Sequence, residues 1–152
     1  MPDKTSVHIL VADDDPDDCL LTREAFRESL PANEVRFVHN GEELLNYLRG
    51  APPFTDRQRY PLPGLILLDL NMPLKDGREA LAEIKADPRL RSIPVVILTT
   101  SAEEEDILRS YANGVNSFIT KPVSFSGLLA VVHALGHYWL DIVALPTEQK
   151  SL

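Results

Sequence analysis

Short apolar runs alternate along this chain with longer segments of helical periodicity. The runs at residues 7–12, 34–38, 64–68, 94–98 and 117–120 are predicted to be β-strands. The longer segments are predicted to be helices, one after Pro16 and others at 41–50, 77–87, 102–113 and from 123 onward. The run at 64–68 is apolar without a break, which is typical of a central strand covered on both faces. The pattern therefore predicts an α/β fold, with a doubly wound parallel sheet of five strands.

The first predicted helix begins at a proline and has apolar residues along it. Pro16 suits the first turn of a helix, where its missing amide costs nothing. Leu20, Ala25 and Phe26 follow it, and we expect these three side chains to share the buried face.

The composition is that of one ordinary domain. The chain has 152 residues, 44% of them hydrophobic and 25% charged, which is enough for one sizeable core. The single cysteine, Cys19, excludes an internal disulfide, and residues 1–11 lack a signal-peptide pattern, so a cytoplasmic location is expected. The net charge of -8 argues against nucleic acid as a partner. Segment 123–145 is long and apolar, but its polar residues favour a packed helix over a membrane span.

The segment at residues 50–63 is a long proline-bearing loop between two predicted elements. Loops of this length are usually functional or mobile. Arg57 and Arg59, with Arg49 just before the loop, form a small basic patch on an acidic protein. Two interpretations remain open, a solvated loop or a docking site for a partner.

Polar side chains follow four of the five predicted strands. The first strand ends in Asp13, Asp14 and Asp15, and the third ends in Asp69. Thr99 and Lys121 follow the fourth and fifth strands. The carboxyl ends of parallel strands meet at one edge of the sheet, where ligands bind in such folds.

Carboxylates that converge at this edge can hold a hard cation such as Mg²⁺. A carboxylate beside the ion could then act as a nucleophile toward phosphorus and form an aspartyl phosphate. Asp15, Asp17 and Asp18 fit a simpler role, as a helix N-cap and a solvated face. Asp69 is harder to explain in that way, because a carboxylate at the end of an apolar strand is costly to bury without a partner.

In these motifs the chain resembles the receiver domain of bacterial two-component response regulators from residue 7 to about residue 138. The resemblance rests on Asp13-Asp14, on residues 68–73 with Asp76-Gly77, on residues 98–101, and on residues 120–122. It implies the flavodoxin-like strand order 2-1-3-4-5. It also implies a single receiver domain over residues 1–152, with a core at about 7–138.

The resemblance assigns roles at matching positions. Asp69 would be the phosphoacceptor, and the metal Mg²⁺ would be bound by Asp14, Asp69 and the backbone carbonyl of Asn71, with Asp13 acting through water. Thr99 and Lys121 would contact the phosphoryl group, and Phe118 would be the aromatic residue that moves on phosphorylation. The implied partner is a sensor histidine kinase. Segment 76–79, the loop before residue 64 and the ending at 138–146 resemble stand-alone regulators paired with phytochrome-type kinases, which implies red-light signalling.

The last predicted helix has more apolar surface than one packed face requires. Its polar side chains form one narrow stripe that includes Ser126, His133, His137 and Asp141. The surplus apolar surface predicts a homodimer through this helix and an arm at about 139–152. The alternative is that this tail folds back over its own domain. The residues predicted at this interface are Leu128, Val131, Leu135, Tyr138, Trp139 and Ile142.

The sequence therefore favours a phosphorylatable signalling protein whose output is contact with an unidentified downstream protein. It would catalyse only its own phosphorylation and dephosphorylation. Two alternatives remain, a magnesium-dependent phosphohydrolase and a flavodoxin-like cofactor module. The first expects an acid two residues after the nucleophile, where Asn71 stands, and the second expects a phosphate-binding first loop, where the acids at 13–15 stand.

Overall fold

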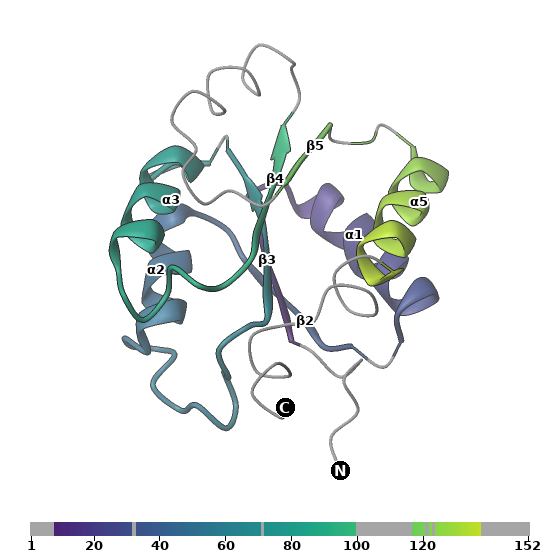
Figure 1. The fold of residues 1–152 in the computed structure, drawn as a ribbon. Coiled ribbons are helices and arrows are strands. Elements are labelled where there is room, and N and C mark those ends of the chain that lie inside the picture. The colour runs from purple at the N-terminus through teal and green to yellow at the C-terminus, as the bar shows by residue number, and fades with distance from the viewer. Residues whose placement is uncertain are drawn as a thin grey trace.

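The architecture is a five-stranded parallel sheet with helices on both faces (Figure 1). The computed structural model describes residues 8–31, 33–70, 72–99, 117–120, 122 and 124–137. The strands lie in the order β2-β1-β3-β4-β5, which confirms the predicted order. Their bounds are Ile9–Ala12 for β1, Val35–Val38 for β2, Leu65–Asp69 for β3, Val95–Thr99 for β4 and Ser117–Thr120 for β5.

The central strands are apolar throughout because each of their faces supplies a separate core. Successive side chains of a strand point to opposite faces. Leu10, Ile66 and Leu68 pack with α2 (Gly41–Arg49) and α3 (Gly77–Ala86). Ile9, Val11, Leu65 and Leu67 pack on the opposite side, with α1 (Pro16–Ser29) and α5 (Phe125–Leu135). The unbroken apolar run at 64–68 is thus explained by two layers of helices.

Polar N-cap residues begin the described helices. The side chain of each N-cap residue accepts hydrogen bonds from backbone amides of the first turn. These residues are Asp15 for α1, Asn40 for α2, Asp76 for α3 and Ser124 for α5. These bonds satisfy amides that have no partner within the helix. Pro16 lies in the first turn of α1, as predicted. The predicted helix at 102–113 lies outside the described residues.

One expectation for α1 was wrong. Leu20 is 58% exposed, while Ala25 and Phe26 are buried as predicted. Cys19 and Thr22 are the residues that share the buried face with them. Leu20 lies away from this face because each residue of an α-helix advances about 100° around the axis.

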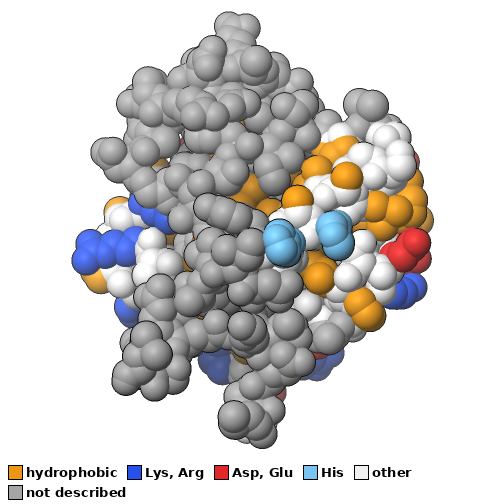
Figure 2. Space-filling view, turned by 45° about the vertical axis from the view of Figure 1, so that its right-hand side comes forward, with side chains coloured by type: hydrophobic (Ala, Val, Ile, Leu, Met, Phe, Trp, Pro, Cys, Tyr) orange, Lys and Arg blue, Asp and Glu red, His pale blue; other side chains and the backbone are white. Residues whose placement is uncertain are grey.

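The α5 helix packs against α1 and presents a polar stripe to solvent. Ser126, His133 and His137 are exposed, as predicted. Figure 2 shows this side of the molecule, where histidine side chains lie at the surface beside hydrophobic ones. No helix in the described part of the chain is long and apolar enough to cross a membrane.

The predicted dimer residues fall into three groups. Leu135 is 3% exposed and belongs to the core beneath α5, so its place at an interface is not supported. Leu128 and Val131 are half-buried against the same core. Tyr138, Trp139 and Ile142, with the rest of the predicted arm at 139–152, lie outside the described residues.

The loop at residues 50–63 is packed onto the domain rather than simply solvated. Phe54 is buried and forms an aromatic cluster with Tyr47 of α2 and Tyr60. The Arg57 guanidinium donates hydrogen bonds to the carbonyl oxygens of Tyr47 at 2.9 Å, Leu48 at 2.7 Å and Tyr60 at 3.1 Å.

The predicted basic patch is therefore smaller than the sequence suggested. Arg57 binds the carbonyls at the end of α2, and Arg49 forms an ion pair with Glu83 at 3.1 Å. Arg59 is exposed, with its guanidinium near the Tyr60 ring. A docking role for this loop stays a prediction.

Candidate functional site

Three aspartates meet at the carboxyl edge of the sheet. Ala12, the last residue of β1, pairs with Leu68 of β3, so Asp13, which follows β1, lies beside Asp69, the last residue of β3. Asp14 is the next residue along the chain. Asp13, Asp14 and Asp69 each offer a carboxylate oxygen, and these oxygens lie within 4.8 Å of one another. The structure thus brings together the three acids that the sequence singled out.

The burial of this acidic group fits an ion-binding role. Asp13 is 1% exposed and Asp69 is 5% exposed, while Asp14 is exposed to solvent. Negative charges this close repel one another, and the repulsion is strongest where water is excluded. A divalent cation relieves it, and hard oxygen ligands are those that Mg²⁺ and Mn²⁺ take. The open side at Asp14 leaves room for water or a phosphoryl oxygen.

Backbone contacts order the turn from β1 into α1. The amide of Asp15 donates to the Asp13 carboxylate at 3.0 Å. The Asp15 carboxylate accepts from the amides of Asp17 at 2.9 Å and Asp18 at 3.4 Å. Asp15 is therefore the N-cap of α1, which confirms the simpler role predicted for it.

The loop from β3 into α3 is held at both of its ends. The Gly77 amide donates to the Leu70 carbonyl at 2.9 Å, and the Gly41 amide of α2 donates to the Lys75 carbonyl at 2.8 Å. A Cβ on Gly41 would lie 2.2 Å from that Lys75 oxygen, so α2 can approach this loop only with glycine there. Leu74 lies in the same loop with a positive φ of 65°.

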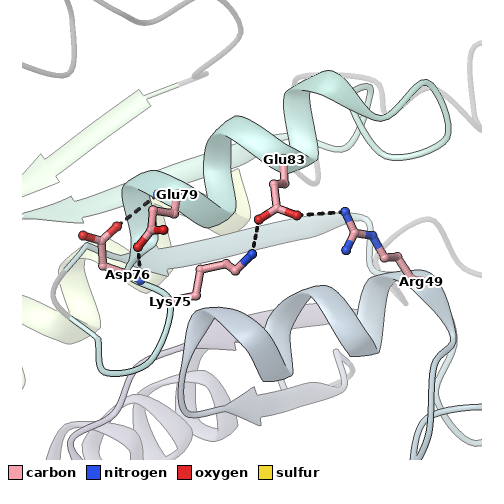
Figure 3. A network of polar contacts seen from close by, with 5 residues as sticks. All are labelled: Arg49, Lys75, Asp76, Glu79 and Glu83. Carbon is pink, nitrogen blue, oxygen red and sulfur yellow. Dashed lines mark hydrogen bonds and ion pairs between the residues drawn. The ribbon is translucent and has the colours of Figure 1, made fainter.

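Charged side chains fasten the same loop to the two helices beside it (Figure 3). Glu83 of α3 pairs with Lys75 of the loop and with Arg49 of α2, the latter at 3.1 Å. The hydrogen bond from Lys75 is the main reason why the pKa of Glu83 lies below its ordinary value, and Arg49 adds to the effect. Asp76 and Glu79 complete the start of α3 as a capping box.

The structure locates some of the other predicted site residues and does not describe the rest. Thr99 is the last residue of β4 and pairs with Thr120 of β5, so it ends its strand at the same edge as Asp69. Phe118 lies within β5. Asn71 and Lys121 lie outside the described residues, so their roles stay predictions.

Sequence reasoning did not find the side chains that support the acidic group. The Cys19 thiol lies 3.3 Å from the carbonyl oxygen of Asp13, and the His39 ring nitrogen Nδ1 lies 3.2 Å from it. Gly77, Lys75 and Glu83 were not predicted as supports either. Each of these contacts joins residues from different elements, so neither the periodicity of the sequence nor a local motif predicts it.

Comparison with known proteins identifies the family. Residues 9–133 match the response regulator receiver domain. The chain belongs to this family. This receiver domain is 40% identical over 138 residues to response regulator Rcp1 of Synechocystis sp., an alignment that covers 91% of this chain and 92% of Rcp1.

Solved structures agree with this assignment. The phosphorylated cyanobacterial phytochrome response regulator RcpA is 44% identical and superposes with a TM-score of 0.82, covering 92% of this receiver domain and 98% of that chain. The Mn²⁺-bound form of Rcp1 is 39% identical, with a TM-score of 0.79 over 92% of this chain and 99% of that chain. This receiver domain is thus homologous to stand-alone phytochrome response regulators, and its acidic group is compatible with a phosphoryl acceptor and a divalent ion.

Proposed function

We propose that this receiver domain accepts a phosphoryl group on Asp69 from a histidine kinase in a magnesium-dependent reaction. The observation that carries the proposal is the acidic group, in which Asp69 ends the central strand beside Asp13 and Asp14. One homologue has been solved in a phosphorylated form and another with Mn²⁺ bound, which supports the same chemistry here.

The reaction needs little from the protein besides placement and charge. A carboxylate oxygen of Asp69 attacks phosphorus, a bond forms between them, and the bond from phosphorus to the kinase histidine nitrogen breaks. The electron pair of that bond stays with the histidine ring, which takes up a proton from solvent. Because Asp69 ends a buried strand, its main chain is held firmly, and one of its carboxylate oxygens lies within 4.8 Å of those of Asp13 and the exposed Asp14.

The metal would be held by Asp14 and Asp69, with the Asn71 carbonyl, and Asp13 would act through water. When bound, Mg²⁺ neutralises the charge that gathers on the phosphoryl oxygens. Thr99 and Lys121 would contact the phosphoryl group, and Phe118 would change its position when that group is bound. Phosphorylation would then shift an equilibrium between two conformations.

Incubation with acetyl phosphate and Mg²⁺, followed by intact mass measurement, tests the proposal. We expect one added phosphoryl group, which Asp69→Asn abolishes and EDTA prevents. Asp15→Asn is the matched control, because it removes an acid from the same turn while asparagine still caps α1. Loss of the adduct in this control, or an adduct that survives Asp69→Asn, would contradict the assignment.

A second incubation, with a phosphomonoester in place of acetyl phosphate, separates this proposal from an enzyme acting on other substrates. We propose that the chain catalyses only its own phosphorylation and dephosphorylation. Repeated turnover of a phosphomonoester would instead establish a phosphohydrolase.

We further propose that the kinase is of the phytochrome type and that the chain works in the cytoplasm. The support is the homology to phytochrome response regulators. Transfer from a purified phytochrome-type kinase and from an unrelated histidine kinase can be compared at equal concentrations. Faster transfer from the unrelated kinase would contradict the pairing.

We also propose a homodimer and an output through contact with another protein. The half-buried Leu128 and Val131 on α5 are the described residues that support a dimer surface. Sedimentation with and without phosphorylation tests it, and a monomer at high concentration in both states would refute it. The downstream protein remains to be identified by its preference for the phosphorylated form.

A further inference from the structure

Two side chains from different elements converge on one backbone oxygen beside the acidic group. The Cys19 Sγ atom of α1 lies 3.3 Å from the carbonyl oxygen of Asp13, and His39 Nδ1, from the residue after β2, lies 3.2 Å from it. A carbonyl oxygen can only accept hydrogen bonds, so both side chains donate. Nδ1 of His39 therefore carries a hydrogen, which assigns the tautomer of the neutral ring.

The Asp13 carbonyl oxygen lies between two of the three acids of the candidate site. The carbonyl belongs to the peptide group that joins Asp13 to Asp14. The peptide group is planar, and the Cα atoms of Asp13 and Asp14, which carry the two carboxylate side chains, lie at its two ends. Two donors from different elements thus restrain the orientation of the peptide group that joins the two acids.

Other contacts hold the remaining freedom of Asp13. Its amide donates to the Val38 carbonyl at 3.0 Å, and its carboxylate accepts from the Asp15 amide at 3.0 Å. The peptide group before Asp13, the one after it and its side chain are therefore all hydrogen-bonded.

Each donor residue also has a contact of its own that restrains it. Cys19 is buried in α1, which begins two residues after Asp14. The His39 ring is exposed, but the His39 amide donates to the Glu43 carboxylate of α2 at 2.6 Å. Packing alone would explain a buried cysteine and solvation alone an exposed histidine. Neither explains why both reach the same oxygen.

We propose that Cys19 and His39 are positioning residues for divalent-ion binding by the group of Asp13, Asp14 and Asp69. They hold the peptide group between Asp13 and Asp14 in the orientation at which the three carboxylates face one ion. This inference rests on the proposed function, because it assumes that the acidic group binds a divalent ion. Hydrogen-bond partners behind metal ligands commonly change metal affinity by about tenfold or more when removed.

Titration of the full chain with Mn²⁺ by calorimetry, at a fixed pH above the ordinary pKa of histidine, tests the proposal. Cys19→Ala and His39→Leu remove the donors, and Cys19→Ser and His39→Asn replace them with other donors. We expect the double variant Cys19→Ala/His39→Leu to bind Mn²⁺ about tenfold more weakly than the unaltered chain. We expect Cys19→Ser/His39→Asn to recover most of that loss.

A general loss of stability must be separated from a loss of positioning. Ala25→Gly is the matched control, because Ala25 is buried on the same face of α1 as Cys19 and glycine weakens a helix. We expect Ala25→Gly to lower the melting temperature and leave the Mn²⁺ dissociation constant unchanged. His39→Leu alone keeps the test available if the double variant does not fold, since residue 39 is exposed.

The possible outcomes separate the positioning role of Cys19 and His39 from the metal-dependent function on which it rests. Mn²⁺ binding by the double variant at the affinity of the unaltered chain would overturn the positioning role alone. Equal weakening by Ala25→Gly, or no recovery in the serine and asparagine variants, would also overturn it. Failure of the unaltered chain to bind Mn²⁺ would overturn the proposed metal-dependent function itself.

Discussion

The amide of Gly77 donates a hydrogen bond to the carbonyl oxygen of Leu70 at 2.9 Å, which closes the loop that follows Asp69. A Cβ on residue 77 would lie 2.5 Å from the Asp69 carbonyl oxygen and 2.7 Å from the Leu70 Cα. Both are main-chain atoms of the site, which cannot rotate away as the end of a side chain can. The α3 helix begins this close to the proposed phosphoacceptor only because residue 77 is glycine.

Gly77→Ala should therefore disturb the site and the fold together. We expect the free energy of unfolding to fall by about 1 to 3 kcal/mol, as for other overpacked positions, and phosphorylation by acetyl phosphate to slow. Gly127→Ala in α5 is the control, because its Cβ would meet side-chain atoms, the Ser124 hydroxyl at 3.2 Å and the Pro122 Cβ at 3.3 Å, rather than main chain, and alanine favours a helix. Urea denaturation and intact mass measure both effects. Normal stability and rate in Gly77→Ala would show that the loop can shift.

Asp14→Asn should stabilise the metal-free protein and abolish its stabilisation by Mg²⁺. Removing one of three close negative charges relieves repulsion, worth about 1 kcal/mol near a solvent-exposed carboxylate. The unaltered chain should gain about 2.7 kcal/mol at a Mg²⁺ concentration 100 times its dissociation constant. Thermal unfolding in EDTA and in Mg²⁺ measures both, with Asp15→Asn as the control. An equal Mg²⁺ effect in Asp14→Asn would remove this residue from the ligand set.

Local chemistry and strand order made most of the fold and the acidic group predictable. Asp13 and Asp69 were found because each directly follows an apolar run, and parallel strands bring their carboxyl ends to one edge. Asp15 was identified as an N-cap because an acid before a proline-initiated helix has a local role. These inferences need only short stretches of sequence and the rules of sheet topology.

Tertiary contacts account for what the sequence did not reveal. Leu20 is a different case, because the advance of about 100° per residue already sets it away from Ala25 and Phe26 on α1, and this error was one of helix geometry. Arg57 was interpreted as part of a basic patch, although its guanidinium binds backbone carbonyls of α2 and the loop. His39 meets Asp13 only after β2 has paired with β1. No pattern in a single sequence records such contacts.

Arg57→Ala should destabilise the loop at residues 50–63 without affecting metal binding. Its guanidinium satisfies carbonyls at the end of α2, and a hydrogen bond to a charged donor contributes about 1.5 to 3 kcal/mol. Arg57→Lys should recover part of the loss, because lysine keeps the charge without the planar fork. Arg59→Ala is the control, since Arg59 is exposed in the same loop. Urea denaturation and proteolysis of the loop are the measurements, and equal losses in both alanine variants would contradict the specific role of Arg57.

Glu83→Gln should weaken the dependence of stability on acidic pH. The hydrogen bond from Lys75, and after it the one from Arg49, holds the pKa of Glu83 below its ordinary value. A carboxyl with a lowered pKa in the folded state contributes stability above its unfolded pKa, and that contribution disappears as the pH falls through the folded pKa. The unfolding free energy of Glu83→Gln, subtracted from that of the unaltered chain, should therefore be positive near neutral pH and approach zero in acid. At neutral pH the difference should stay below about 1 kcal/mol, because Glu83 is partly exposed.

Glu42→Gln, an exposed change in α2, controls for the loss of one negative charge. A difference for Glu83→Gln that does not change with pH would show that the pairs with Lys75 and Arg49 add no stability through this carboxylate.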